Sequence, residues 1–317
     1  ILLPFVMAFI ATKWIFPKTL NIALEKNIVD NPNARKLQRT PVPILGGLTI
    51  FFGMAMGIAC SMLFGDYADI FPVVVSMILI LLIGTMDDII DLSPTFRFAV
   101  EILIVLILIF SSGASLNDFH GLWGFYEVPM WFSLMLTIIA AVGMINAINL
   151  IDGIDGLSSG FCIMASSLFG IMFYFAGNSS MLVLAAVSIG ALIPFFFHNV
   201  FGRTSKMFIG DGGTLLMGII LSTFVIRTLT HGTSCASLNP NLGLIPFTIA
   251  VMSIPVFDTL RVMSIRMLRG KSPFSPDKTH LHHLFIEMGF SHIGATVSIL
   301  TFNTIIVACW WLSYRLG

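Results

Sequence analysis

The densest group of polar side chains lies between Asn146 and Leu157, where the sequence reads Asn-Ala-Ile-Asn-Leu-Ile-Asp-Gly-Ile-Asp-Gly-Leu. Two amides, Asn146 and Asn149, stand three residues apart, and two carboxylates follow at the same spacing, Asp152 and Asp155. Side chains at this spacing fall on neighbouring faces of one helical path. Their oxygens are the hard ligands that Mg²⁺ prefers, and the glycine after each aspartate lets the backbone approach a ligand closely. The pattern favours a ligand site with Mg²⁺ over an ordinary polar turn.

A second acidic group follows an earlier apolar run. Asp87, Asp88 and Asp91 lie within about one helical turn. Like charges at this spacing repel one another unless a cation holds them together. The group therefore implies a bound metal or a basic neighbour, and Arg97 is a candidate partner for these acids or for a phosphate. A polar cap at a membrane edge is the alternative.

A third motif, Phe208-Ile-Gly-Asp-Gly-Gly, opens another apolar run. Its glycines would expose backbone N–H groups at the positive end of a helix, while Asp211 could hold a metal. This arrangement suits a diphosphate bridged by Mg²⁺. A turn without a ligand is the alternative.

A histidine cluster, His280, His282 and His283, follows a basic stretch of the chain. It could form a metal site, or it could surround phosphate oxygens together with nearby cations. Hard oxygen ligands elsewhere in the chain, and the lack of a Cys or Glu partner in this run, favour phosphate contact. A surface cluster without a role is the third alternative. Asp258, with Arg261 one turn further on, could form a structural ion pair inside the helix bundle or take part in the site.

The composition identifies the class of protein that carries these motifs. The chain has 317 residues, of which 57% are hydrophobic and 10% charged, whereas soluble domains carry about a quarter charged residues. This indicates a polytopic membrane protein. The net charge is zero and the chain shows no nucleic-acid motif, so we expect no nucleic-acid partner. The four scattered cysteines indicate neither a disulfide framework nor a zinc site.

Apolar runs of about twenty residues can cross a bilayer, and dividing the chain at its Pro, Gly and charge clusters predicts ten such spans. Their approximate ranges are 1–16, 45–64, 70–86, 96–112, 130–147, 157–176, 181–199, 210–229, 243–266 and 292–314. The predicted fold class is therefore all-α. We expect a single transmembrane catalytic domain over residues 1–317, with no separate soluble domain.

Lysine and arginine predict the orientation, because cytoplasmic loops carry an excess of them. With both termini outside, fourteen of the sixteen basic residues lie inside. The inner loops are then 17–44, 87–97, 148–156, 200–209 and 261–291. The acidic and histidine motifs converge on these loops, which predicts a cytoplasmic active site in a multi-pass protein of the inner (plasma) membrane. Only Asp258 and Glu101 are expected deeper in the bilayer.

In this order along the chain, the motifs resemble the polyprenyl-phosphate N-acetylhexosamine 1-phosphate transferase family. The matching segments are Asn33-Ala-Arg-Lys36, Pro43-Ile-Leu-Gly-Gly47, Asp87-Asp88, Asn146 to Leu157, Gly210-Asp211 and His280-Leu-His-His283. The resemblance implies ten transmembrane helices, a homodimer, and Mg²⁺, for which Mn²⁺ could substitute. It also implies transfer of a sugar 1-phosphate from a UDP-sugar to a polyprenyl phosphate such as undecaprenyl phosphate, with release of UMP.

The resemblance also implies roles for single residues. Asn149 and Asp211 match the metal ligands, Asp211 being catalytic as well. Asp87 and Asp88 match the catalytic acidic pair at the lipid phosphate. The three histidines match the motif that faces the diphosphate.

The remaining matched residues are expected to bind substrate. Asn146, Asp152 and Asp155 belong to the nucleotide-facing segment, and Arg97 stands where many relatives carry a basic residue. The run from Ser272 to His283 favours N-acetylglucosamine 1-phosphate as the transferred group. Alternative donors are UDP-N-acetylmuramoyl-pentapeptide or another UDP-N-acetylhexosamine. A transporter of an anionic solute is the alternative from another class, and it requires ionisable residues near the middle of the membrane.

Overall fold

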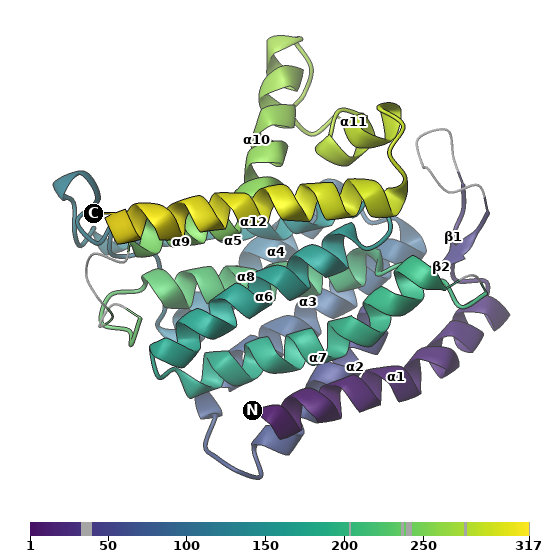
Figure 1. Ribbon diagram of the computed structural model, residues 1–317, viewed down its shortest axis with the longest axis horizontal. Coiled ribbons are helices and arrows are strands. Elements are labelled where there is room, and N and C mark those ends of the chain that lie inside the picture. Colours follow the sequence, from purple (N-terminus) through teal and green to yellow (C-terminus); the bar gives the residue numbers. More distant parts are fainter. Residues whose placement is uncertain (33–39, 203, 236–237, 239–242, 276–277, 317) are drawn as a thin grey trace.

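A computed structural model describes residues 1–32, 40–202, 204–235, 238, 243–275 and 278–316. This part of the chain is almost entirely helical, and most helices pack side by side into an elongated bundle (Figure 1). The helices are α1 (Leu2–Glu25), α2 (Gly46–Ser61), α3 (Phe71–Ile90), α4 (Pro94–Ser112), α5 (Met130–Leu150), α6 (Leu157–Phe175), α7 (Ser179–Phe201), α8 (Gly210–Leu229), α9 (Leu244–Val251), α10 (Ser253–Leu268), α11 (Leu281–Glu287) and α12 (His292–Leu316). Two short antiparallel strands, β1 (Val29–Asp30) and β2 (Val42–Pro43), lie at one end of the bundle. The predicted all-α class is confirmed.

Seven of the described helices are long and apolar enough to cross a membrane, namely α3, α4, α5, α6, α7, α8 and α12. The pair α9 and α10 would make an eighth span if it is counted as one. A polytopic membrane protein is therefore confirmed, but the number of spans differs from the predicted ten. The apolar helix α2 has only 16 residues, and α1, which carries Lys13 and Lys18, is not among the seven.

Several helices continue into the segments that were predicted as loops. α1 runs past Pro17 to Glu25, and α10 runs to Leu268. Lysine, arginine and glutamate end an apolar run without ending a helix, because they are good helix formers. Residues 17–25 and 261–268 of the predicted inner loops are therefore helical.

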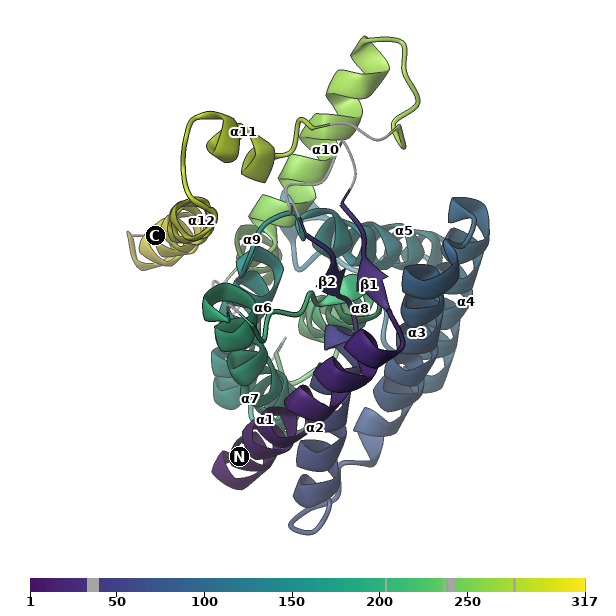
Figure 2. The same cartoon turned by 90° about the vertical axis from the view of Figure 1, so that its right-hand side faces the viewer.

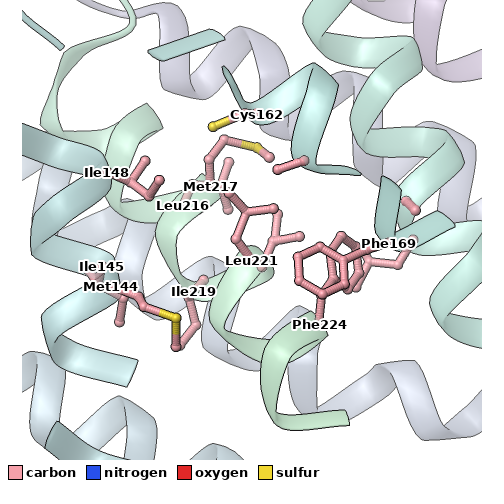
Figure 3. Packing of buried hydrophobic residues seen from close by; sticks show 14 of the residues in the cluster. Met144, Ile145, Ile148, Cys162, Phe169, Leu216, Met217, Ile219, Leu221 and Phe224 are labelled. Carbon is pink, nitrogen blue, oxygen red and sulfur yellow. The ribbon is translucent and has the colours of Figure 1, made fainter. Parts of the chain in front are cut away.

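α8 occupies the centre of the bundle, where 94% of its spanning segment is buried. A helix that is apolar on all sides is stable only when other helices surround it. α5 and α6 supply part of this surround: Ile145 and Ile148 lie on one side of α8, and Cys162 and Phe169 on another (Figure 3). The packing fixes the position of the first residues of α8, which carry the Gly-Asp-Gly-Gly motif.

A backbone contact fixes the same end of α8 to α2. The N–H of Phe208 donates to the carbonyl of Pro43 at 2.8 Å, and the N–H of Gly47 donates to the carbonyl of Ile209 at 2.8 Å. The segment from Pro43 to Gly47 thus aligns the start of α2 with the start of α8. The Asn33 to Lys36 motif lies outside the described residues.

α9 and α10 are bent by 71° relative to each other, so α10 projects away from the bundle (Figures 1 and 2). Pro255 has no N–H to donate to the carbonyl of Val251, which weakens the helix at this point. The buried amide of Asn303 on α12 compensates, since its Nδ2 donates to Val251 and its Oδ1 accepts from the N–H of Ile254. The predicted span 243–266 therefore consists of two helices with a sharp bend between them, and Asp258 lies on the projecting helix.

Candidate active site

Four helix ends meet at the end of the bundle where β1 and β2 lie, and they bring together side chains that are far apart in sequence. α3 contributes Asp87 and Asp88 from its last turn, and α4 contributes Arg97 from its first turn. α5 contributes Asn149, and α8 contributes Asp211. We call these five residues the acidic site. The structure thus joins three motifs that the sequence could only place on the same side.

Asp88 caps the N-terminus of α8. Its Oδ1 accepts a hydrogen bond from the N–H of Asp211 at 2.8 Å, and its Oδ2 accepts one from the N–H of Gly212 at 3.0 Å. Gly210 has a φ of +70°, and a Cβ there would lie 2.6 Å from Asp88 Oδ2. The N–H groups that we expected to receive a diphosphate therefore donate to Asp88, because a carboxylate at a helix N-terminus satisfies both charge and hydrogen bonds.

Arg97 is the cation that the acidic group implied. Its Nη1 lies 2.7 Å from Asp87 Oδ2 and 3.2 Å from Asp211 Oδ2, while its Nη2 donates to Asn146 Oδ1 at 3.3 Å. The rigid guanidinium fork can serve several oxygens at once, which a lysine ammonium does less well. Arg97 thus links α3, α5 and α8 through one side chain.

Glu101 completes this network and is a residue that the sequence reasoning did not assign to the site. Its side chain is fully buried, its Oε1 lies 3.4 Å from Arg97 Nε, and its Oε2 accepts from Asn146 Nδ2 at 2.5 Å. Both ends of the Asn146 amide are therefore engaged by protein groups. The signal that could have identified Glu101 is its position one helical turn after an arginine in an otherwise apolar helix.

Asn149 lies directly against Asp211. Its Nδ2 donates to Asp211 Oδ1 at 2.7 Å and to Thr214 Oγ1 at 2.8 Å. Rotating the side-chain amide of Asn149 by roughly 180° about its Cβ–Cγ bond would exchange Nδ2 and Oδ1, so that Oδ1 would lie beside Asp211. Carboxylate and amide oxygens form a donor set that fits Mg²⁺, which commonly takes one or two carboxylates and completes its shell with water and substrate phosphates. Among the described residues, no group of three or more His, Cys, Asp or Glu side chains forms a complete metal cage.

The turn 152–156 joins α5 to α6, and its two aspartates differ in their partners. Asp152 accepts a hydrogen bond from the hydroxyl of Ser158. Asp155 Oδ2 lies 2.7 Å from Lys206 Nζ and 3.0 Å from His292 Nδ1. Burial raises the pKa of Asp155, but these contacts outweigh it and hold the pKa below its usual range. Asp155 thus connects the turn to α12 and to the 202–209 segment, and the isolated His292 has a structural partner.

The histidine cluster lies beside the same turn. His280 and His282 are both buried, and the ring of His282 packs against Gly153. Asp258 and Arg261 form the expected ion pair at 2.7 Å, but on the projecting α10 and not inside the bundle. Asp258 also contacts His280, which the sequence reasoning did not foresee.

Comparisons with known proteins show which family the chain resembles. The segment 70–229 matches the family described as "Glycosyl transferase family 4". The chain is 32% identical over 303 residues to a Bacillus subtilis (strain 168) protein named probable undecaprenyl-phosphate N-acetylglucosaminyl 1-phosphate transferase. The matched region covers 92% of this chain and 79% of that protein. It is 28% identical to the undecaprenyl-phosphate alpha-N-acetylglucosaminyl 1-phosphate transferases of Salmonella typhi and Escherichia coli (strain K12), over 88% of this chain and 74% of each relative.

Proposed function

The chain belongs to glycosyl transferase family 4 and is an enzyme of the polyprenyl-phosphate N-acetylhexosamine 1-phosphate transferase family, and we propose that it transfers N-acetylglucosamine 1-phosphate from UDP-N-acetylglucosamine to undecaprenyl phosphate. The names of its relatives support undecaprenyl phosphate as the acceptor and N-acetylglucosamine 1-phosphate as the transferred group. The observation that carries the proposal is the acidic site, in which Asp87, Asp88, Arg97, Asn149 and Asp211 converge. The product would begin a lipid-linked glycan of the cell envelope.

The reaction exchanges one phosphoanhydride for another. An oxygen of the lipid phosphate forms a bond to the phosphorus that carries the sugar, and the bond from that phosphorus to the bridging oxygen of UDP breaks, so that UMP leaves. We expect the equilibrium to be nearly thermoneutral. Catalysis then consists mainly of positioning and of neutralising charge.

The protein residues suit positioning better than proton removal. A phosphate monoester has a second pKa near 6 and is largely dianionic at neutral pH, so the attacking oxygen needs no strong base. Asp87 and Asp88 are each held by hydrogen bonds, to the N–H of Leu92 and to the start of α8 respectively. Arg97, which lies between the acids, is the side chain in this network that can also hold a phosphate oxygen.

Asn149 and Asp211 would hold Mg²⁺, with Mn²⁺ as a substitute. The ion would neutralise the charge that develops on the diphosphate as UMP leaves. The histidine cluster would face the diphosphate, with Asp152 and Asp155 toward the nucleotide. For Asp155 this role must be compatible with its contacts to Lys206 and His292.

The orientation is part of the same proposal. A site on the cytoplasmic side of the plasma membrane, with both termini outside, agrees with the excess of basic residues in the predicted inner loops. In this topology α1, α2 and the bent pair would count with the seven long apolar helices as ten spans. A homodimer stays a prediction from the resemblance.

The nucleotide product tests the proposal. Purified protein would be incubated with UDP-N-acetylglucosamine, undecaprenyl phosphate and Mg²⁺, with Asp211→Asn as the inactive control. We expect release of UMP that requires both lipid and metal and is lost in the variant. Release of UDP would show that the sugar moves without its phosphate, and the proposed reaction would be wrong. UMP formed only from UDP-N-acetylmuramoyl-pentapeptide, or from another UDP-N-acetylhexosamine, would assign the alternative donor.

A further inference from the structure

Asp258 lies on the projecting α10, yet the residue is only 4% exposed. Its Oδ1 accepts from Arg261 Nη2 at 2.7 Å and from Arg261 Nε at 3.2 Å. Its Oδ2 lies 2.9 Å from His280 Nδ1, and the N–H of Leu281 lies 3.2 Å from both oxygens. One buried carboxylate therefore holds the side chain of His280 and the first residue of α11.

The contact with Asp258 places a proton on Nδ1 of His280. An ionised carboxylate can only accept hydrogen bonds, so Nδ1 of His280 must carry the proton in this contact. The other ring nitrogen, Nε2, is not bound by Asp258. A carboxylate partner is a common means of holding an imidazole in one tautomer and one orientation.

His280 connects Asp258 to the rest of the histidine cluster. The rings of His280 and His282 are parallel to within 4°, with their centroids 5.8 Å apart. The ring centroids of His282 and His283 are 4.2 Å apart. Burial beside the other two imidazoles lowers the pKa of His282 to about 3. His282 is therefore neutral at neutral pH and can pack against the backbone without burying a charge.

The cluster meets the acidic side of the site at Gly153, between Asp152 and Asp155. A Cβ at this position would lie 2.0 Å from His282 Nε2, so the contact requires a glycine. A continuous set of contacts thus runs from Asp258 through His280 and His282 to the 152–156 turn. Its first member is more than a hundred residues away from its last in the sequence.

We propose that Asp258 is a positioning residue for the transfer reaction, because it orients His280 and thereby holds the histidine cluster against the turn that carries Asp152 and Asp155. This role rests on the proposed function, in which the cluster faces the diphosphate. Asp258 itself need not touch either substrate. Its effect on the rate should therefore pass through His280.

A kinetic double-mutant cycle tests this dependence. We expect Asp258→Asn to lower kcat by on the order of 10²-fold, since a small misplacement of a reacting group has costs of this size. In a His280→Asn background, the same substitution should lower kcat by less than about threefold, because its target is already gone. Losses that multiply in the double variant would overturn the inference, as would a single Asp258→Asn variant that keeps its rate within about threefold of the original protein.

Asp118→Asn is the matched control. Asp118 lies near the opposite end of α8, and its Oδ2 is also 2.9 Å from the Nδ1 of a histidine, His231. The control changes the same atoms in the same kind of pair, away from the acidic site. It should leave kcat unchanged, and a loss equal to that of Asp258→Asn would attribute both effects to general destabilisation and refute the assigned role.

A chemical readout separates this inference from the proposed function. Carbethoxylation by diethyl pyrocarbonate, followed residue by residue by mass spectrometry, reports how accessible each imidazole is. We expect His282 to be protected in the original protein and reactive in Asp258→Asn, while the exposed His231 reacts equally in both. Unchanged protection of His282 would overturn the inference. If no nucleotide is released by any protein, the proposed function fails, and the labelling still decides whether Asp258 holds the cluster.

Discussion

The carboxylate of Asp88 accepts a hydrogen bond from the backbone N–H of Asp211 at 2.8 Å, so one acidic residue of the site fixes the position of another. The two residues come from α3 and α8, which are packed together along the bundle. Because Asp88 also binds the N–H of Gly212, it acts as the N-cap that the sequence at the start of α8 lacks. The spacing between the acids therefore depends on a helix cap.

Asp88→Asn tests whether this aspartate positions groups or removes a proton. Asparagine offers one acceptor oxygen, and its NH₂ would face a backbone N–H. We expect the rate to fall by on the order of 10²-fold and the free energy of unfolding to fall by about 0.5–2 kcal/mol, the usual cost of a lost cap. The loss should be similar from pH 6 to pH 9 in a pH–rate profile. Recovery of the rate at high pH would show that Asp88 is a base.

Glu101→Ala should weaken the network around Arg97. It removes a buried carboxylate that lies 3.4 Å from Arg97 Nε, and it leaves the guanidinium with fewer partners. We expect the free energy of unfolding to fall by about 3 kcal/mol, as when one partner of a buried ion pair is removed. In Glu101→Gln, which keeps the contact with Asn146, the free energy of unfolding should fall by less. Thermal unfolding of detergent-solubilised protein measures both, with the exposed Glu25→Gln as control, and equal stability of all three variants would contradict the role.

Magnesium should stabilise the folded protein through Asp211. A ligand that binds only the folded state stabilises it by about 2.7 kcal/mol at a hundred times its Kd. We expect added MgCl₂ to raise the Tm, and EDTA to reverse the rise. Asp211→Asn should remove the shift, whereas Asp118→Asn should keep it. A shift of the same size in Asp211→Asn would place the metal elsewhere.

The contacts of His231 with Asp118 and Glu127 should make the stability of the protein depend on pH. Its Nδ1 lies 2.9 Å from Asp118 Oδ2 and its Nε2 lies 3.3 Å from Glu127 Oε1, and these carboxylates raise the pKa of His231. A raised pKa in the folded state means that the stabilisation is complete below the unfolded value of about 6.5 and is lost as the pH rises through the folded value. The Tm difference between the original protein and His231→Gln should therefore be larger at pH 6 than at pH 9. A difference that grows with pH would refute this.

The fold class and the site motifs could be predicted from the sequence because each depends on a local pattern. Apolar runs of spanning length identify α3 to α8 and α12, and the family motifs identify Asp87, Asn149 and Asp211 without reference to packing. Charge, however, is a poor guide to where a helix ends. α1 and α10 continue through lysine and arginine residues that were expected to begin loops.

The partners of the site residues could not be predicted in the same way. Glu101 was expected only as an acid deep in the membrane, and it proves to be joined to Arg97 and Asn146 once α4 and α5 pack together. Asp155 was expected to face a nucleotide, and the fold brings Lys206 and His292 to it from two other segments. Which neighbour satisfies a buried charge depends on contacts between distant residues.

The sequence by itself thus determined that this is a polytopic membrane enzyme, and which residues carry its motifs, because hydropathy and residue type act locally along the chain. Only the tertiary structure decided that Asp88 caps α8, that Arg97 joins the acids, and that Asp258 holds His280. The physical reason is that a buried polar group must find a partner within hydrogen-bond reach, and the packing of the helices selects that partner. The bend at Pro255 shows both effects, since proline weakens the helix locally and Asn303 from α12 supplies the missing hydrogen bonds.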